Sequence, residues 1–150
     1  MASISKFYNE DGTIVAIIDD VLDIIELFGL IGWLTELNYR GEGCYKTITL
    51  DRKQLWFHEE LKPFCSRWKK PHERWEPNEY THILKQIQNR IVEVVKAFSE
   101  SQGFKWDLDG HNSCLINKYE NGTQHIPPHK DTHLSFGEEP IIIGFSVGQK

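Results

Sequence analysis

This chain is built around the stretch Asn112-Ser113-Cys114-Leu115-Ile116-Asn117-Lys118-Tyr119 and the His129-Lys130-Asp131 that follows it. On an extended strand, residues two apart point to the same face and lie roughly 6.6 Å apart along the backbone. The imidazole of His129 and the carboxylate of Asp131 can therefore converge on one ion. Imidazole plus carboxylate is the ligand chemistry of non-haem iron(II), whose site requires two histidines and one carboxylate. The motif supplies one of the two histidines.

The strand before this motif carries a second pair of polar residues. Asn117 and Tyr119 are two apart, so they share one face with Ser113 and Leu115. An amide offers both a donor and an acceptor, and a phenol can donate to a carboxylate. The two side chains therefore place hydrogen-bonding groups on one face of the strand. The alternative is a buried polar pair whose hydrogen bonds are satisfied by the backbone. For His129-Lys130-Asp131 the alternative is an ordinary surface turn.

Taken together, the Asn-x-Tyr, the Asn121-Gly122 turn, the His-x-Asp and a Pro-Ile strand over Pro140–Gly148 resemble AlkB-like 2-oxoglutarate- and Fe(II)-dependent dioxygenases. The resemblance implies that Fe(II) is held by His129 and Asp131. It also implies that 2-oxoglutarate, the co-substrate, is bound by Asn117 and Tyr119. The implied reaction is oxidative demethylation of alkylated nucleic-acid bases, in which an N-methyl group is hydroxylated and leaves as formaldehyde.

The same resemblance bears on the segment Asp51-Arg52-Lys53-Gln54-Leu55-Trp56-Phe57. In AlkB-like enzymes the comparable region forms a lid with an arginine and aromatic residues over the substrate, so Arg52 and Trp56 are the predicted substrate-binding residues. A guanidinium and an aromatic plane suit a flipped base or another flat ligand. The alternative is an exposed charged turn ahead of an aromatic core residue.

The resemblance implies an α+β fold, a partial double-stranded β-helix or jelly roll with N-terminal supporting helices. The length favours a single domain over residues 1–150, which by the same resemblance would be AlkB-like. About eight core strands close the family's barrel, and roughly four are visible here, which would leave sheet edges open. Hydrophobic periodicity and turn signals predict the other elements of the chain. They are a loose end at Met1–Asp11, a buried strand at Thr13–Ile18, a helix from Asp19-Asp20 through Leu34, a strand at Tyr45–Leu50, a loop at Leu61–Pro77, and a helix capped by Asn78 that ends near Gly103.

The third metal ligand is not found in the motif. His125 and His133 are poorly placed to share an ion with the pair, and the remaining histidines are scattered singly. In AlkB-like enzymes the second metal histidine and the arginines that clamp 2-oxoglutarate lie downstream of the Pro-Ile strand, whereas this chain ends at Lys150. We therefore expect a chain truncated at its C-terminus. The alternatives are a second chain that supplies the remaining ligands, or a catalytically inactive or incomplete jelly-roll module for binding or interaction.

Composition limits the partners and the compartment. With 17 basic and 22 acidic residues the net charge is −5, so the chain as a whole does not attract a polyanion. Binding of alkylated DNA or RNA, the expected partner, would require a local basic patch. The three cysteines lack metal-ligand spacing, and the sequence shows no signal peptide and no apolar run long enough to cross a bilayer. We therefore expect a cytoplasmic or nuclear protein with no membrane partner.

Overall fold

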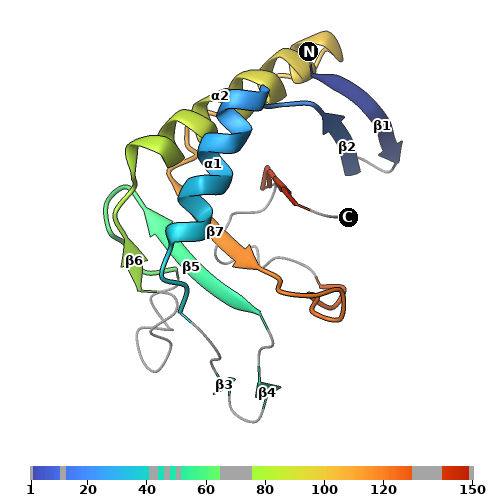
Figure 1. Cartoon of the computed structure of the whole chain (residues 1–150). Helices are drawn as coiled ribbons and strands as arrows, with labels where there is room; N and C mark the ends of the chain where they lie inside the picture. Colours follow the sequence, from blue (N-terminus) through green and yellow to red (C-terminus); the bar gives the residue numbers. More distant parts are fainter. Residues whose placement is uncertain are drawn as a thin grey trace. The chain divides into compact units, whose positions relative to one another are not determined.

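A computed structural model describes residues 2–10, 13–40, 44–45, 48–49, 52–64, 76–129 and 140–148. Its contacts divide the chain into two compact units. The helical unit consists of Met1–Glu36, Thr81–Asp109 and Val147–Lys150, and the sheet unit consists of Leu37–Tyr80 and Gly110–Ser146. Helices and strands are both present, as Figure 1 shows, so the mixed α and β composition is confirmed. Closure into a double-stranded β-helix stays a prediction, and so does the single domain.

The helical unit begins with an antiparallel hairpin. β1 (Ser3–Glu10) pairs with β2 (Thr13–Asp19) along the whole length of both strands. The prediction of a loose N-terminus was wrong for β1, because its Phe7 packs edge-on against the ring of Phe98, with centroids 5.7 Å apart. The strand prediction at β2 is confirmed, but the strand is not buried. Its side chains alternate, and those of Val15 and Ile17 are exposed.

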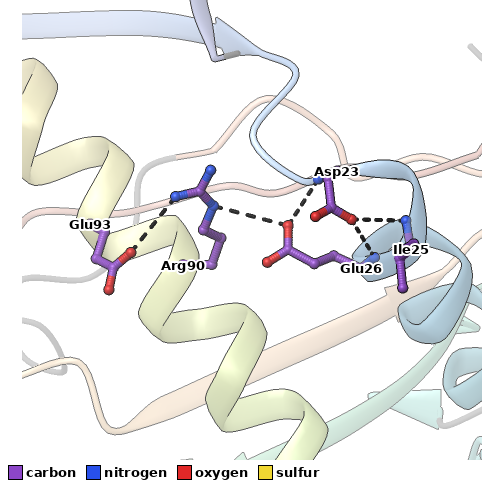
Figure 2. Close-up of polar contacts among 5 residues, drawn as sticks. All are labelled: Asp23, Ile25, Glu26, Arg90 and Glu93. Atoms are coloured by element: carbon purple, nitrogen blue, oxygen red, sulfur yellow. Dashed lines mark hydrogen bonds and ion pairs between the residues drawn. The ribbon is translucent and has the colours of Figure 1, made fainter.

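Helix α1 (Ile24–Glu36) starts at a capping box, which Figure 2 shows. The Oδ1 of Asp23 accepts hydrogen bonds from the backbone N–H groups of Ile25 and Glu26, both at 2.8 Å, and Glu26 Oε2 accepts from the N–H of Asp23 at 2.9 Å. This reciprocal pattern satisfies donors that a helix start leaves without partners. The helix was predicted, but its start at Asp19-Asp20 was wrong, because the aspartate that caps it is Asp23.

Helix α2 (His82–Ser101) is the longest element, and its apolar stripe is confirmed as a packing face that buries Leu84, Ile87 and Phe98. The predicted cap at Asn78 was wrong, because the N-cap is Thr81, whose hydroxyl accepts from the N–H of Leu84. The end near Gly103 is confirmed. That glycine has φ +77°, a left-handed conformation that residues with a Cβ rarely adopt. Arg90 on α2 lies 4.0 Å from the carboxylate of Glu26 on α1 (Figure 2).

The sheet unit is organised around β5 (Lys53–His58), which lies between β6 (Pro77–Asn78) and β7 (Ser113–Lys118). β6 runs parallel to β5, and β7 runs antiparallel to it. Residues Gln54 to His58 are all buried, so the strand is covered on both faces. The lid expected at 51–57 is therefore wrong for 53–57, which form the central strand of this sheet.

Three other segments, Tyr45–Leu50, Leu61–Pro77 and Pro140–Gly148, were predicted as a strand, a loop and a strand. The single strand expected at Tyr45–Leu50 is instead the pair β3 (Cys44–Tyr45) and β4 (Ile48–Thr49), in which Cys44 pairs with Thr49. The strand expected at Pro140–Gly148 is wrong, because residues 140–148 form no regular element. In the predicted loop at Leu61–Pro77, residues 65–75 lie outside the described residues.

Neither of the helices that the structure describes has the length and apolar character of a membrane span.

Candidate cofactor site at one end of the β5–β7 pair

The register of β5 and β7 places two amide side chains opposite each other. Gln54 on β5 pairs with Asn117 on β7, and residues directly opposite in a pair share one face of the sheet. Arg52 immediately precedes β5, and Tyr119 immediately follows β7. Because the two strands are antiparallel, the start of one lies beside the end of the other. Arg52, Gln54, Asn117 and Tyr119 therefore belong to the same end of the β5–β7 pair.

Hydrogen bonds join three of these side chains. Arg52 Nε donates to Asn117 Oδ1 at 3.1 Å, and Gln54 Nε2 donates to the same oxygen at 2.6 Å. Gln54 is 1% exposed, and its Oε1 has no hydrogen-bond partner among the described residues. A buried polar atom left without a partner costs about 1–3 kcal/mol, so other interactions must offset this cost to hold Gln54 in place. We call Arg52, Gln54 and Asn117 the amide cluster.

The predicted site residues differ in exposure. Asn117 is half-buried within the amide cluster, and Tyr119 is exposed. Arg52 is half-buried. Trp56, in contrast, is buried; its Nε1 donates to the carbonyl of Lys62 at 2.9 Å, and its ring meets Phe64 edge-on at 4.9 Å. These contacts are those of a packing residue. The substrate roles of Arg52 and Trp56 stay predictions.

A charged pair lies beside the amide cluster. Lys53 Nζ is 2.7 Å from Glu120 Oε1, and both side chains are exposed. The hydrogen bond and charge of Lys53 lower the pKa of Glu120, with a smaller contribution from Lys118. Because the pair is exposed, its effect on stability is small. Glu120 therefore balances the charge of Lys53. The guanidinium of Arg52, in contrast, donates to the neutral amide of Asn117.

The predicted metal ligands are only partly described. His129 lies in the segment after β7, is exposed, and has its Nδ1 2.9 Å from the carbonyl oxygen of Pro127. Since a carbonyl can only accept, this contact places the proton of a neutral imidazole on Nδ1 and the lone pair on Nε2. Metal-binding histidines have this second hydrogen bond, which fixes the ring. The chemistry of His129 thus fits a metal ligand. Asp131 lies outside the described residues, so the pairing of the two stays a prediction.

Other side chains in the described part of the chain do not add to a metal site. Within the described part of the chain, no three histidine, cysteine, aspartate or glutamate side chains gather as ligands. The thiol of Cys114 is on β7, and burial raises its pKa to about 11. It therefore stays protonated at neutral pH and is neither a ready nucleophile nor a thiolate ligand. Burial also raises the pKa of Tyr80 well above its usual range, and the nearby Cys114 and Glu59 add to this shift.

Sequence reasoning missed Gln54. The available signal was a polar residue next to the apolar run Leu55-Trp56-Phe57, which reads as a buried strand once its leading charges are set aside. A buried amide requires hydrogen-bond partners, and a polar side chain on a neighbouring strand can be one of them. The motif Asn117 is that partner, 63 residues away along the chain.

No curated protein and no solved structure matches this chain. The family model of the 2OG-Fe(II) oxygenase superfamily matches residues 24–150, which include the amide cluster, Tyr119, His129 and Asp131. Oxygenases of this superfamily use Fe(II) and 2-oxoglutarate. The match covers most of the sequence, and we conclude that this chain belongs to the 2OG-Fe(II) oxygenase superfamily.

Proposed function

We propose that this chain belongs to an AlkB-like dioxygenase that demethylates alkylated bases in DNA or RNA. The observation that carries the proposal is the superfamily match over residues 24–150, which supports a dioxygenase that uses Fe(II) and 2-oxoglutarate. Within that superfamily, the Asn-x-Tyr and His-x-Asp motifs resemble the AlkB-like branch. Nucleic acid as substrate rests on that resemblance.

The motif residues would divide the work between the metal and the co-substrate. His129 and Asp131 would hold Fe(II), and Asn117 and Tyr119 would bind 2-oxoglutarate. When bound, Fe(II) and 2-oxoglutarate would supply the oxidation, in which one oxygen atom of O₂ enters the N-methyl group, the other enters succinate, and CO₂ is released. The hydroxymethyl group then breaks down to formaldehyde and leaves the base with a proton in place of the methyl. The protein's own part would be to hold and orient the reactants.

The described contacts support an anion at this end of the β5–β7 pair. The amide cluster contains one cation, Arg52, and no carboxylate. Tyr119 follows on the same parity and is exposed, so its hydroxyl can donate to a carboxylate. One guanidinium, one amide and one phenol are a suitable set for part of a dicarboxylate. The resemblance implies that further arginines and a second metal histidine complete the site.

The test is coupled product formation. Single-stranded DNA and RNA oligonucleotides with one N-methylated base are incubated with Fe(II) and 2-oxoglutarate, using residues 1–150 and a version extended downstream along the coding sequence. We expect little succinate from the short chain, and from the extended version succinate and formaldehyde in equal amounts. His129→Ala should abolish both products, whereas His125→Ala, a nearby histidine outside the motif, should retain them.

The other outcomes separate the alternatives. Succinate from the extended version without a change in any methylated base would overturn the nucleic-acid substrate and leave the oxygenase. Absence of both products from the extended version would favour an inactive binding or interaction module. Strong turnover by residues 1–150 alone would refute the expectation that a ligand is missing.

A further inference from the structure

The amide cluster fixes which atom of Asn117 faces outward from it. Arg52 carries donors and no acceptor, so the atom that meets its Nε must be an acceptor. On Asn117 that atom is Oδ1. The atom of Gln54 that meets the same oxygen must then be a donor, which is Nε2. The orientation of both amides therefore follows from the chemistry of a guanidinium.

The buried, unpartnered oxygen of Gln54 is the second observation. If the Gln54 amide were turned over, its Oε1 would face Asn117 Oδ1, and two acceptors would repel each other. If both amides were turned over, Asn117 Nδ2 would face Arg52 Nε, and two donors would oppose each other. The one arrangement without such a conflict leaves Gln54 Oε1 buried and without a partner among the described residues. The cluster thus leaves one buried acceptor unsatisfied to keep Asn117 in a single orientation.

We propose that Arg52 and Gln54 are positioning residues that lock the Asn117 amide with its NH₂ group presented to the carboxylate of 2-oxoglutarate. With Oδ1 occupied by two donors, Nδ2 is the hydrogen-bonding atom that Asn117 offers to a ligand. Among the described residues no hydrogen bond occupies that group. A donor at this position selects an acceptor such as a carboxylate and disfavours a ligand that offers an N–H. This inference rests on the proposed 2-oxoglutarate site and adds residues to it.

The lock has a measurable consequence for affinity. If Asn117 were free to turn, it would present its oxygen to the carboxylate for part of the time, and binding would be weakened. Hydrogen bonds to a charged group are among the stronger ones in proteins. Removal of one member of the lock should therefore weaken the binding of 2-oxoglutarate roughly tenfold or more.

The first measurement concerns the lock in the free chain and uses no ligand. Hydrogen exchange of the side-chain NH₂ of Gln54 is followed by NMR on the ¹⁵N-labelled chain. We expect slow exchange, because this group is buried and donates to Asn117. Arg52→Met removes the group that fixes the polarity, and should speed the exchange about tenfold. Lys53→Met is the matched control, since it removes one positive charge from the neighbouring residue but leaves the cluster intact. Unchanged exchange in Arg52→Met would overturn the lock.

The second measurement is a titration with 2-oxoglutarate, followed on the backbone amide signal of residue 117 so that weak binding is still quantified in every variant. Wild type and Lys53→Met should give the same Kd within about twofold, whereas Gln54→Met should weaken it roughly tenfold with no change in charge. Asn117→Asp should keep both hydrogen bonds to its oxygen and the fold, yet lose the binding.

The two measurements fail in different ways. Equal affinity in wild type and Gln54→Met, with weak binding by Asn117→Asp, would overturn the positioning role and leave Asn117 as the ligand-binding residue. No shift of the Asn117 signal in wild type, or unchanged binding by Asn117→Asp, would instead overturn the proposed 2-oxoglutarate site itself. The exchange measurement would still decide whether the lock exists.

Discussion

Trp56 is the predicted substrate residue for which the structure gives the clearest quantitative expectation. Its side chain is 6% exposed, its Nε1 donates to the carbonyl of Lys62, and its ring packs edge-on against Phe64. Trp56→Phe keeps an aromatic ring but removes the hydrogen bond, which contributes about 0.5–1.5 kcal/mol, and some buried area. We expect a loss of about 1–3 kcal/mol in the free energy of unfolding, and about 3–5 kcal/mol for Trp56→Ala.

The assay is urea denaturation followed by circular dichroism, which does not depend on tryptophan fluorescence. Trp106→Phe is the matched control. Trp106 is half-buried, stacks on Phe104 with ring centroids 5.3 Å apart, and has no hydrogen bond from its ring N–H among the described residues. Its replacement should therefore cost less than about 1 kcal/mol. A Trp56→Phe variant with wild-type stability but weakened binding of a methylated base would refute the packing role and support the substrate role.

Three further outcomes are expected from local features. Asp23→Ala removes the acceptor that caps α1 and should lower stability by about 1 kcal/mol in urea denaturation; equal stability would show that the capping box contributes nothing. Gly103→Ala places a Cβ at φ +77° and should cost about 1–2 kcal/mol in the same assay, unless the backbone shifts without cost. Burial raises the pKa of Cys114 from 9.0 to about 11. The buried neutral thiol therefore contributes its full stability below pH 9. This contribution is lost as the pH rises toward 11, because the thiol of the unfolded chain loses its proton first. Cys114→Val should show a smaller alkaline loss, by up to about 2 kcal/mol, when unfolding is measured across that range.

The elements that were predicted correctly have local causes. The stripe of α2 repeats with helical spacing over the whole helix, so it needs no knowledge of its partners. β7 contains the apolar run Cys114-Leu115-Ile116, and its unbroken register with β5 keeps Leu115 and Asn117, two residues apart, on one face. α1 was found from the same kind of spacing, although its first residue was misplaced, because three aspartates precede it and the capping hydrogen bonds select Asp23.

The elements that were missed depend on distant contacts. β1 is rich in polar residues, and its Phe7 finds an aromatic partner in Phe98 on α2. β5 begins beside Arg52 and Lys53, whose charges suggested a turn, yet it is central because β6 and β7 pair with it on both sides. The candidate site followed the same rule. Asn117 could be identified from its own strand, whereas its bonds to Arg52 and Gln54 depend on an antiparallel pairing that no local pattern specifies.

The central claim is that His129 and Asp131 hold a metal ion close to the site occupied by Asn117 and Tyr119. Paramagnetic broadening of the NMR signals by Mn²⁺, which accepts the same imidazole and carboxylate ligands, locates that ion directly. We expect Mn²⁺ to broaden the signals of these four residues first, His129→Ala to abolish the effect, and His125→Ala to retain it. Broadening centred on other residues, or broadening that His129→Ala leaves unchanged, would contradict it.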